Sequence, residues 1–109
     1  MKIAIISDIH SNLAALEAVE RDARAAGVSE FHCLGDFVGY GPQPRAVTER
    51  VMQLCAVTLK GNHEHGVLDA EYARRFNYIG RSALVWTRQR LAGRIWRRSL
   101  VGFLESLKP

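Results

Sequence analysis

Five residues of types that bind metal ions or transfer protons fall in three short clusters along this 109-residue chain. Asp8 and His10 form the first cluster, Asp36 the second, and Asn62 with His63 the third. Carboxylates mixed with imidazole suit Mn, Fe, Zn or Ni, and a carboxylate between two sites can bridge a pair of ions. Asp36 lies as many residues after His10 as Asn62 lies after Asp36, so one repeated structural unit is expected between clusters.

Each cluster follows an apolar segment that predicts a β-strand. Residues 1–6 have no helical period and are rich in isoleucine, which favours a strand buried on both faces of a sheet. Residues 31–34 and 56–59 predict a second and a third strand. Gly35 and Gly61 stand where each of these strands ends, and they would let the backbone approach the clusters closely.

Two stretches between the strands have the period of an amphipathic helix. The first should end at Gly27 in a left-handed cap, and the second should begin at Pro44. Their apolar faces comprise Leu13, Leu16, Val19, Ala23 and Ala26, and then Val47, Val51, Leu54 and Cys55. This βαβαβ order predicts an α/β fold with parallel strands and right-handed crossovers. All three clusters would then meet at the carboxyl edge of the sheet, where such folds bind ligands.

Some of these residues have structural alternatives. Asp8 could cap the first helix, and His10 could be a loop histidine with its hydrogen bonds satisfied locally. His32 is predicted to be a strand residue under a helix and not a ligand. Cys33 and Cys55 lack the Cys-x-x-Cys spacing and lie in apolar contexts, so they predict buried free thiols.

The chain is predicted to be helical from Asp69 onward, and this part is strongly basic. Two apolar stripes are expected, separated by a break near residues 93–99: Leu84, Val85, Leu91, Ala92, Ile95 and Trp96, then Leu100, Leu104 and Leu107. Eight arginines and no acidic residue lie between Tyr72 and Leu104: Arg74, Arg75, Arg81, Arg88, Arg90, Arg94, Arg97 and Arg98. Because no aromatic residues alternate with them in a stacking pattern, they predict a solvated basic surface, and nucleic acid is not an expected partner.

Composition excludes several classes of protein. Hydrophobic residues make up 48% of the chain and charged residues 24%, as in ordinary globular domains, so a disordered chain is not expected. No apolar run has the length of a membrane-spanning helix or of the apolar region of a secretory signal. A cytoplasmic protein without a membrane partner is expected.

The three clusters carry sequence motifs of a known family. Asp8-Ile9-His10, Gly35-Asp36 and Gly61-Asn62-His63-Glu64 resemble the signature of the calcineurin-like metallophosphoesterases. The surrounding Ser-Asp-Ile-His-Ser-Asn-Leu and Gly-Asp-Phe-Val-Gly-Tyr-Gly-Pro resemble its bacterial phosphodiesterase-like branch. The resemblance implies that residues 1–109 are a metallophosphoesterase domain, consisting of the parallel βαβαβ half of the family's sandwich followed by C-terminal helices.

The resemblance also implies roles for the clustered residues. Asp8 and His10 would hold one divalent ion, Asp36 would bridge two, and Asn62 would bind the second. His63 would protonate the leaving group or stabilise the transferring phosphoryl group. A metal-bridging hydroxide would attack phosphorus in a small phosphodiester or phosphomonoester substrate.

Two departures from the family pattern qualify this function. The protein-phosphatase branch has an acid and an arginine where this chain has Gly39 and Tyr40, so phosphoserine protein phosphatase activity is disfavoured, and Glu64 becomes the candidate to orient His63. The family's second half supplies a further histidine and a Gly-His-x-His motif, before which this chain appears truncated. The chain alone is therefore expected to be weakly active or inactive.

Two further expectations follow from the apparent truncation. The alternative to an enzyme is a non-catalytic truncated or regulatory metal-binding fragment. A homo-oligomer is expected in either case, because apolar surface and a strand edge would otherwise stay uncovered.

Overall fold

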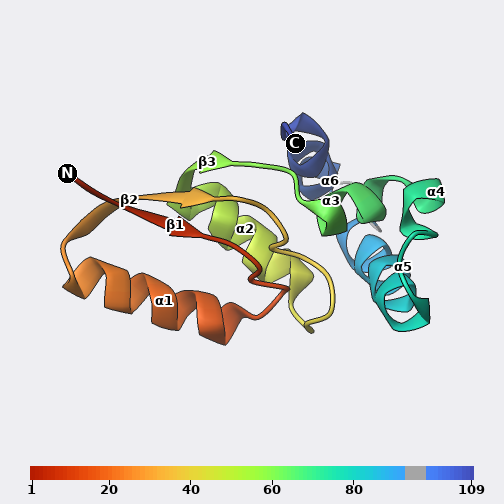
Figure 1. Cartoon of the computed structure of the whole chain (residues 1–109), viewed down its shortest axis with the longest axis horizontal. Coiled ribbons are helices and arrows are strands. Elements are labelled where there is room, and N and C mark those ends of the chain that lie inside the picture. The colour runs from red at the N-terminus through yellow and green to blue at the C-terminus, as the bar shows by residue number, and fades with distance from the viewer. Residues whose placement is uncertain (93–97) are drawn as a thin grey trace.

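The computed structural model describes residues 1–92 and 98–109, which form a parallel sheet followed by a group of helices (Figure 1). The elements in chain order are β1 (Lys2–Ile6), α1 (Leu13–Ala25), β2 (Val28–Cys33), α2 (Pro44–Leu54), β3 (Cys55–Thr58), α3 (Asn62–Leu68), α4 (Ala70–Ala73), α5 (Tyr78–Ala92) and α6 (Arg98–Ser106). The expected βαβαβ unit followed by C-terminal helices is confirmed.

The sheet has the order β1-β2-β3, and both pairings are parallel. Its register places Ile5 opposite His32 and His32 opposite Val57, so these three side chains share one face. All strands run toward the end of the molecule where α3 to α6 lie (Figure 1). The carboxyl ends of the strands therefore meet the C-terminal helices.

Local signals explain where the first two helices begin and end. The Asn12 side chain caps α1 by accepting a hydrogen bond from the Ala15 amide at 3.0 Å, so the alternative in which Asp8 caps this helix is wrong. Gly27 follows α1 with a φ of 89°, as expected for a left-handed cap. Pro44 opens α2 at its first turn, where its missing amide hydrogen costs nothing.

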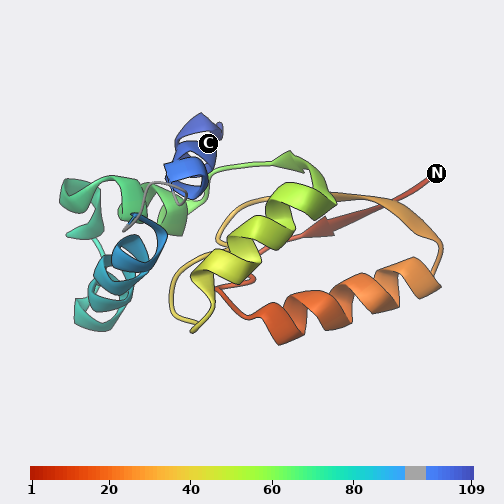
Figure 2. The same ribbon diagram turned by 180° about the vertical axis from the view of Figure 1, so that it is seen from behind.

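The core lies between one face of the sheet and the helices α1 and α2, which Figure 2 shows from behind. Leu16, Val47 and Val51 are buried there with the strand residues Phe31 and Cys33. A charged contact ties the two helices together at the edge of this core, because Glu20 accepts hydrogen bonds from Arg24 of α1 and Arg50 of α2. The Arg50 guanidinium holds the pKa of Glu20 below its usual range.

The other face of the sheet is open, so the prediction that the first strand is buried on both faces is wrong. Ile3 and Ile5 are 46% and 66% exposed, and Val57 on β3 is 46% exposed. Helices cover only one face of this sheet within the described residues, and only one set of side chains along β1 reaches them. His32 is a strand residue as predicted, but it lies on this open face and not under a helix, with its Nε2 2.5 Å from a Glu30 carboxylate oxygen.

The C-terminal part also departs from the sequence prediction at its start. Helix α3 begins at Asn62, ahead of Asp69, where the chain was predicted to become helical, and α4 follows within two residues. Leu84, Leu91, Leu100, Leu104 and Leu107 are buried as expected, whereas Val85 is 52% exposed. Ile95 and Trp96 lie outside the described residues. Near the end of the chain, Lys108 forms a parallel bridge with Leu59, next to β3.

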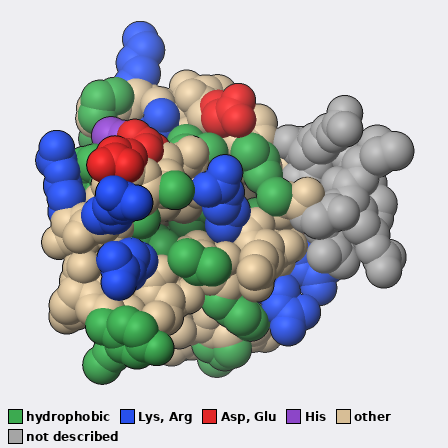
Figure 3. Space-filling view, turned by 90° about the vertical axis from the view of Figure 1, so that its right-hand side faces the viewer, with side chains coloured by type: hydrophobic (Ala, Val, Ile, Leu, Met, Phe, Trp, Pro, Cys, Tyr) green, Lys and Arg blue, Asp and Glu red, His purple; other side chains and the backbone are tan. Residues whose placement is uncertain are grey.

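The basic residues of this part are dispersed over its surface. Figure 3 looks onto this end of the molecule and shows Lys and Arg side chains interspersed with hydrophobic and acidic ones. Arg94 and Arg97 lie outside the described residues. Among the helices that are described, none combines the length and the apolar character needed to cross a membrane.

Both cysteines are free thiols, as predicted, although only Cys33 is fully buried and Cys55 is half-buried. Burial raises the pKa of Cys33 to about 11 and that of Cys55 to about 12.

Because only the thiolate is a good nucleophile, both cysteines should react slowly with Ellman's reagent at pH 8 and faster as the pH rises toward these pKa values. The protein unfolded in urea is the control, and equal rates for the folded and unfolded chain would contradict the prediction.

Candidate metal centre

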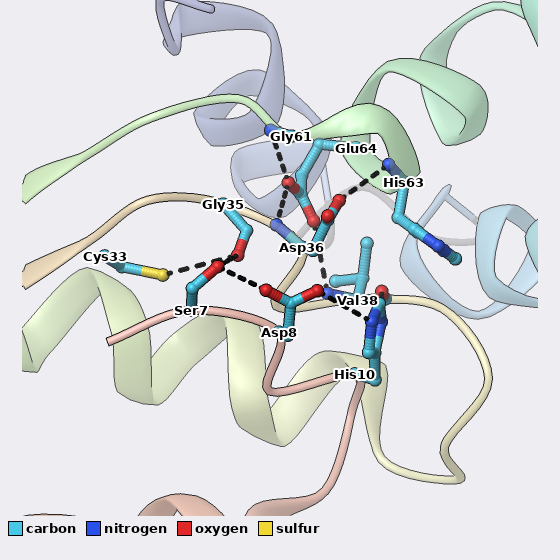
Figure 4. A network of polar contacts seen from close by, with 10 residues as sticks. All are labelled: Ser7, Asp8, His10, Cys33, Gly35, Asp36, Val38, Gly61, His63 and Glu64. Carbon is cyan, nitrogen blue, oxygen red and sulfur yellow. Dashed lines mark hydrogen bonds and ion pairs between the residues drawn. The ribbon is translucent and has the colours of Figure 1, made fainter. Parts of the chain in front are cut away.

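Three polypeptide segments meet where the strands end, and Figure 4 shows how they bring Asp8, His10, Asp36 and His63 into one region. The segment after β1 runs beside the segment after β2, with the Asp8 amide bonded to the Gly35 carbonyl at 3.2 Å and the His10 amide bonded to the Asp36 carbonyl at 3.1 Å. The segment after β3 enters α3 at Asn62. Asp8, His10, Asp36, Asn62 and His63 therefore lie at one edge of the sheet, as the sequence predicted.

Glu64 holds the second and third segments together. Its side chain is fully buried and accepts hydrogen bonds from the amides of Asp36 at 2.7 Å, Gly61 at 2.8 Å and Val38 at 3.2 Å. Burial raises the pKa of its carboxyl group, and the three amides partly offset this effect. Because both Glu64 oxygens contact backbone amides, the expectation that Glu64 orients His63 is not met, and its contacts are structural.

The backbone of the site is unusual. Asp8, His10, Asp36 and Tyr40 have φ values of 58°, 48°, 55° and 60°. These values lie in the left-handed region, where a residue with a side chain costs about 1–3 kcal/mol. Such residues persist only where the surrounding structure determines them, and they concentrate at functional sites. Left-handed residues occur both in the segment after β1 and in the segment after β2. This supports a functional role for this edge of the sheet.

Glycines allow the three segments to come so close, as the sequence predicted. A Cβ atom on Gly35 would lie 2.5 Å from the Gly61 amide nitrogen, and one on Gly61 would lie 2.4 Å from Asp36 Oδ1. A Cβ on Gly41 would lie 2.2 Å from the His10 carbonyl oxygen. Side chains at these positions would push the segments apart and separate the site residues.

Asp8 and His10 form a pair whose chemistry suits a cation. The His10 Nδ1 lies 3.1 Å from the Val38 carbonyl oxygen, which can only accept, so Nδ1 carries the proton in this contact. The other ring nitrogen, Nε2, faces Asp8 Oδ1 at 3.4 Å. The Ser7 hydroxyl donates to the second Asp8 oxygen at 2.6 Å. A carbonyl-bound imidazole with Nε2 beside a carboxylate is the usual arrangement of a histidine that binds metal.

Asp36 and Asn62 are the other two predicted metal ligands. Asp36 Oδ1 accepts a hydrogen bond from the His63 amide at 3.0 Å, which places the carboxylate at the start of α3. The side chain of Asn62 is exposed, and its Oδ1 accepts a hydrogen bond from the Tyr72 hydroxyl at 3.2 Å. Sequence reasoning missed Tyr72, because it lies on α4 outside any motif and only the tertiary structure brings it to Asn62.

His63 is packed among aromatic rings. Its ring centroid lies 4.5 Å from that of His10, 4.9 Å from that of Tyr40 and 5.1 Å from that of Phe76. A Cβ on Gly39 would lie 2.3 Å from His63 Nδ1, so Gly39 is needed for this packing. Nδ1 is buried and has no hydrogen-bond partner within the described part of the chain.

The environment of His63 also affects its charge. Burial and, to a smaller extent, the neighbouring His10 lower the pKa of its imidazole, while Asp36 and Asp8 act in the opposite direction. His63 is therefore neutral at pH 7. Tyr40 was noted in the sequence only as a departure from the family pattern, yet its ring contacts both histidines.

The donor set fits a divalent cation in its chemistry but does not enclose one. Carboxylate, imidazole and amide oxygen donors from Asp8, His10, Asp36 and Asn62 suit the transition metals predicted from the sequence. Across residues 1–92 and 98–109, no three His, Cys, Asp or Glu side chains stand together as a metal-binding group. The pair formed by Asp8 and His10 is thus preformed, and further donors would be needed to complete a site.

The chain is similar to a known protein family and to two individual proteins. The sequence model of the calcineurin-like phosphoesterase family matches residues 1–104. A protein of Methanocaldococcus jannaschii, named only as uncharacterised, is 42% identical over 105 residues, which are 96% of this chain and 41% of that protein. The crystal structure of a metallophosphoesterase from Sphaerobacter thermophilus matches 98% of this chain with a TM-score of 0.75 and 40% identity. The chain spans 41% of the length of each relative.

The contact between Gly61 and Asp36 gives a test of the site's packing. In Gly61→Ala, the new Cβ would also lie 2.6 Å from the Asp36 backbone nitrogen, so we expect a loss of about 1–3 kcal/mol in the free energy of unfolding. Gly102→Ala is the matched control, because Gly102 lies inside α6 with no atom near its Cβ position. The control should gain about 0.5–1 kcal/mol. Urea unfolding measures both changes, and equal effects would contradict this account.

Proposed function

This chain belongs to the calcineurin-like phosphoesterase family, and from that premise we propose that it contributes to a divalent-metal-dependent site that hydrolyses small phosphoesters. The observation that carries the proposal is the pair of Asp8 and His10, in which Nε2 of the imidazole faces a carboxylate oxygen at 3.4 Å. Asp36, Asn62 and His63 lie at the same edge of the sheet. Phosphodiesters and phosphomonoesters are the proposed substrates.

Each residue has a proposed role in such a site. Asp8 and His10 would hold one ion, and Asn62 would bind a second. Asp36 would serve both ions. A bound cation would neutralise charge on the phosphoester oxygens and lower the pKa of water. His63, whose ring packs against His10, would contact the leaving group or the phosphoryl group. The native metal would be Mn, Fe, Zn or Ni.

A second candidate function is a non-catalytic metal-binding fragment. The observation that favours it is the lack of any group of three His, Cys, Asp or Glu donors in the described chain. The chain spans 41% of the length of each relative. Asp8, His10, Asp36 and Asn62 supply few donors for two ions, so further donors would be needed to bind both. We propose that the 109 residues alone retain weak metal binding and little turnover.

Metal binding by variants of the site residues tests the proposal. We expect Asp36→Asn to weaken Mn²⁺ binding more than His10→Ala does, because Asp36 is proposed to serve both ions. Titration calorimetry with Mn²⁺ measures the affinity and the number of ions bound. If Asp36→Asn binds Mn²⁺ as the unaltered chain does, the proposed bridging role is wrong.

Turnover separates the two candidate functions. The initial rate of bis-p-nitrophenyl phosphate hydrolysis in Mn²⁺ should be very low for this chain, because misplacement of reacting groups by about 1 Å can reduce the rate about a hundredfold. A version extended through a Gly-His-x-His segment should be active, and Asp36→Asn should abolish that activity. Robust turnover by the short chain would mean that it already holds a complete site. No turnover by the extended version would favour the non-catalytic fragment.

We propose that the chain forms a homo-oligomer through the open face of the sheet. We also propose a location in the cytoplasm, where free thiols such as Cys33 persist. Ile3, Ile5 and Val57 expose apolar surface on that face of the sheet. We expect a second copy of the chain to cover this surface.

Light scattering tests the oligomer. Ile5→Lys should shift the chain toward the monomer by at least a severalfold rise in the dissociation constant, since it places a charge in the apolar surface. Ile79→Lys is the matched control, because Ile79 on α5 is 71% exposed and lies far from the sheet in sequence. A monomer at all concentrations, or equal effects of both variants, would refute the oligomer.

A further inference from the structure

We propose that Tyr72 is a positioning residue that holds the side-chain amide of Asn62 in the orientation needed to bind a divalent cation. The proposal rests on the metal-dependent function inferred above, and it adds a residue that belongs to no motif of the chain. Its basis is the hydrogen bond that the Tyr72 hydroxyl donates to Asn62 Oδ1 at 3.2 Å.

Several contacts that do not involve the hydroxyl hold Tyr72 in position. The ring stacks on His65 with 3.8 Å between centroids and an angle of 3° between planes. The Arg75 guanidinium carbon lies 4.8 Å from the same ring. The Tyr72 amide also donates to the Asp69 side chain, which caps α4. Because these contacts do not involve the hydroxyl, the ring should stay in place when the hydroxyl is removed.

Asn62, by contrast, has little else to orient it. It is the first residue of α3, and its side chain is exposed. A free amide at such a position can rotate and exchange its oxygen and nitrogen ends, of which only the oxygen can bind a cation. The Tyr72 hydroxyl bonds one lone pair of Oδ1 and leaves the other available. It therefore selects the oxygen end of the amide without occupying the whole acceptor.

Residues that hydrogen-bond to metal ligands affect affinity, and their removal commonly weakens binding 10- to 100-fold. In this proposal, His65 and Arg75 hold the Tyr72 ring in place, and the Tyr72 hydroxyl holds the Asn62 side chain. The sequence pattern alone does not predict the contact between Tyr72 and Asn62, because the two residues lie on different helices.

The test compares Tyr72→Phe with Tyr78→Phe in the 109-residue chain. Tyr72→Phe removes only the hydroxyl, and Tyr78→Phe is the matched control because Tyr78 is 77% exposed on α5. The first readout needs no metal: nuclear magnetic resonance of the Asn62 side-chain amide protons, which can be assigned because the chain has only two other asparagines and three glutamines. We expect their chemical shifts to change in Tyr72→Phe and not in the control.

The second readout is Mn²⁺ affinity, measured by calorimetry and by paramagnetic broadening of the Asn62 amide signals. We expect about tenfold weaker binding in Tyr72→Phe, with the control unchanged. Unchanged amide signals would overturn the positioning role. Unchanged or tighter Mn²⁺ binding would also overturn it, since the hydroxyl would then be irrelevant or would compete with the ion. Lack of Mn²⁺ binding by the unaltered chain would refute the metal site itself, and the metal-free signals would still decide whether Tyr72 orients Asn62.

Discussion

The buried carboxylate of Glu64 is the contact on which the candidate site depends. It accepts amide hydrogen bonds from the segment after β2 and from the segment after β3, which are far apart in sequence. Leaving a buried backbone amide without a hydrogen-bond partner costs about 1–3 kcal/mol. The Glu64 side chain avoids this cost for three amides that no strand or helix satisfies. These three contacts offset part of the cost of burying Glu64, and its carboxyl pKa remains raised.

The same constraint explains why strained backbone can persist here. Asp8, His10 and Asp36 adopt left-handed conformations, and each is followed or faced by a segment that is fixed by hydrogen bonds. Gly35 and Gly61 let those segments approach each other. Glu64 then accepts a hydrogen bond from the Asp36 amide, and Asp36 Oδ1 accepts one from the His63 amide. The strain is thus distributed over residues that the proposed function uses, whereas the core beneath the sheet has ordinary packing.

The arrangement of the layers separates structure from function in this chain. The helices α1 and α2 bury one face of the sheet, and Phe76, between α4 and α5, packs against the buried His63 ring. The opposite face of the sheet remains apolar and open. The residues proposed to bind metal depend on the first two contacts and not on what covers the open face.

The sequence by itself determined the α/β class, the order of the βαβαβ elements and the edge at which Asp8, His10, Asp36, Asn62 and His63 meet. These follow from local periodicity and from the rule that parallel strands end on one side. Only the tertiary structure decided that Ile5 is exposed, because burial depends on which layers are present and not on the strand's own composition. Likewise, the backbone contacts of Glu64 and the bond from Tyr72 to Asn62 join residues on separate segments, and such contacts arise only when packing brings those segments together.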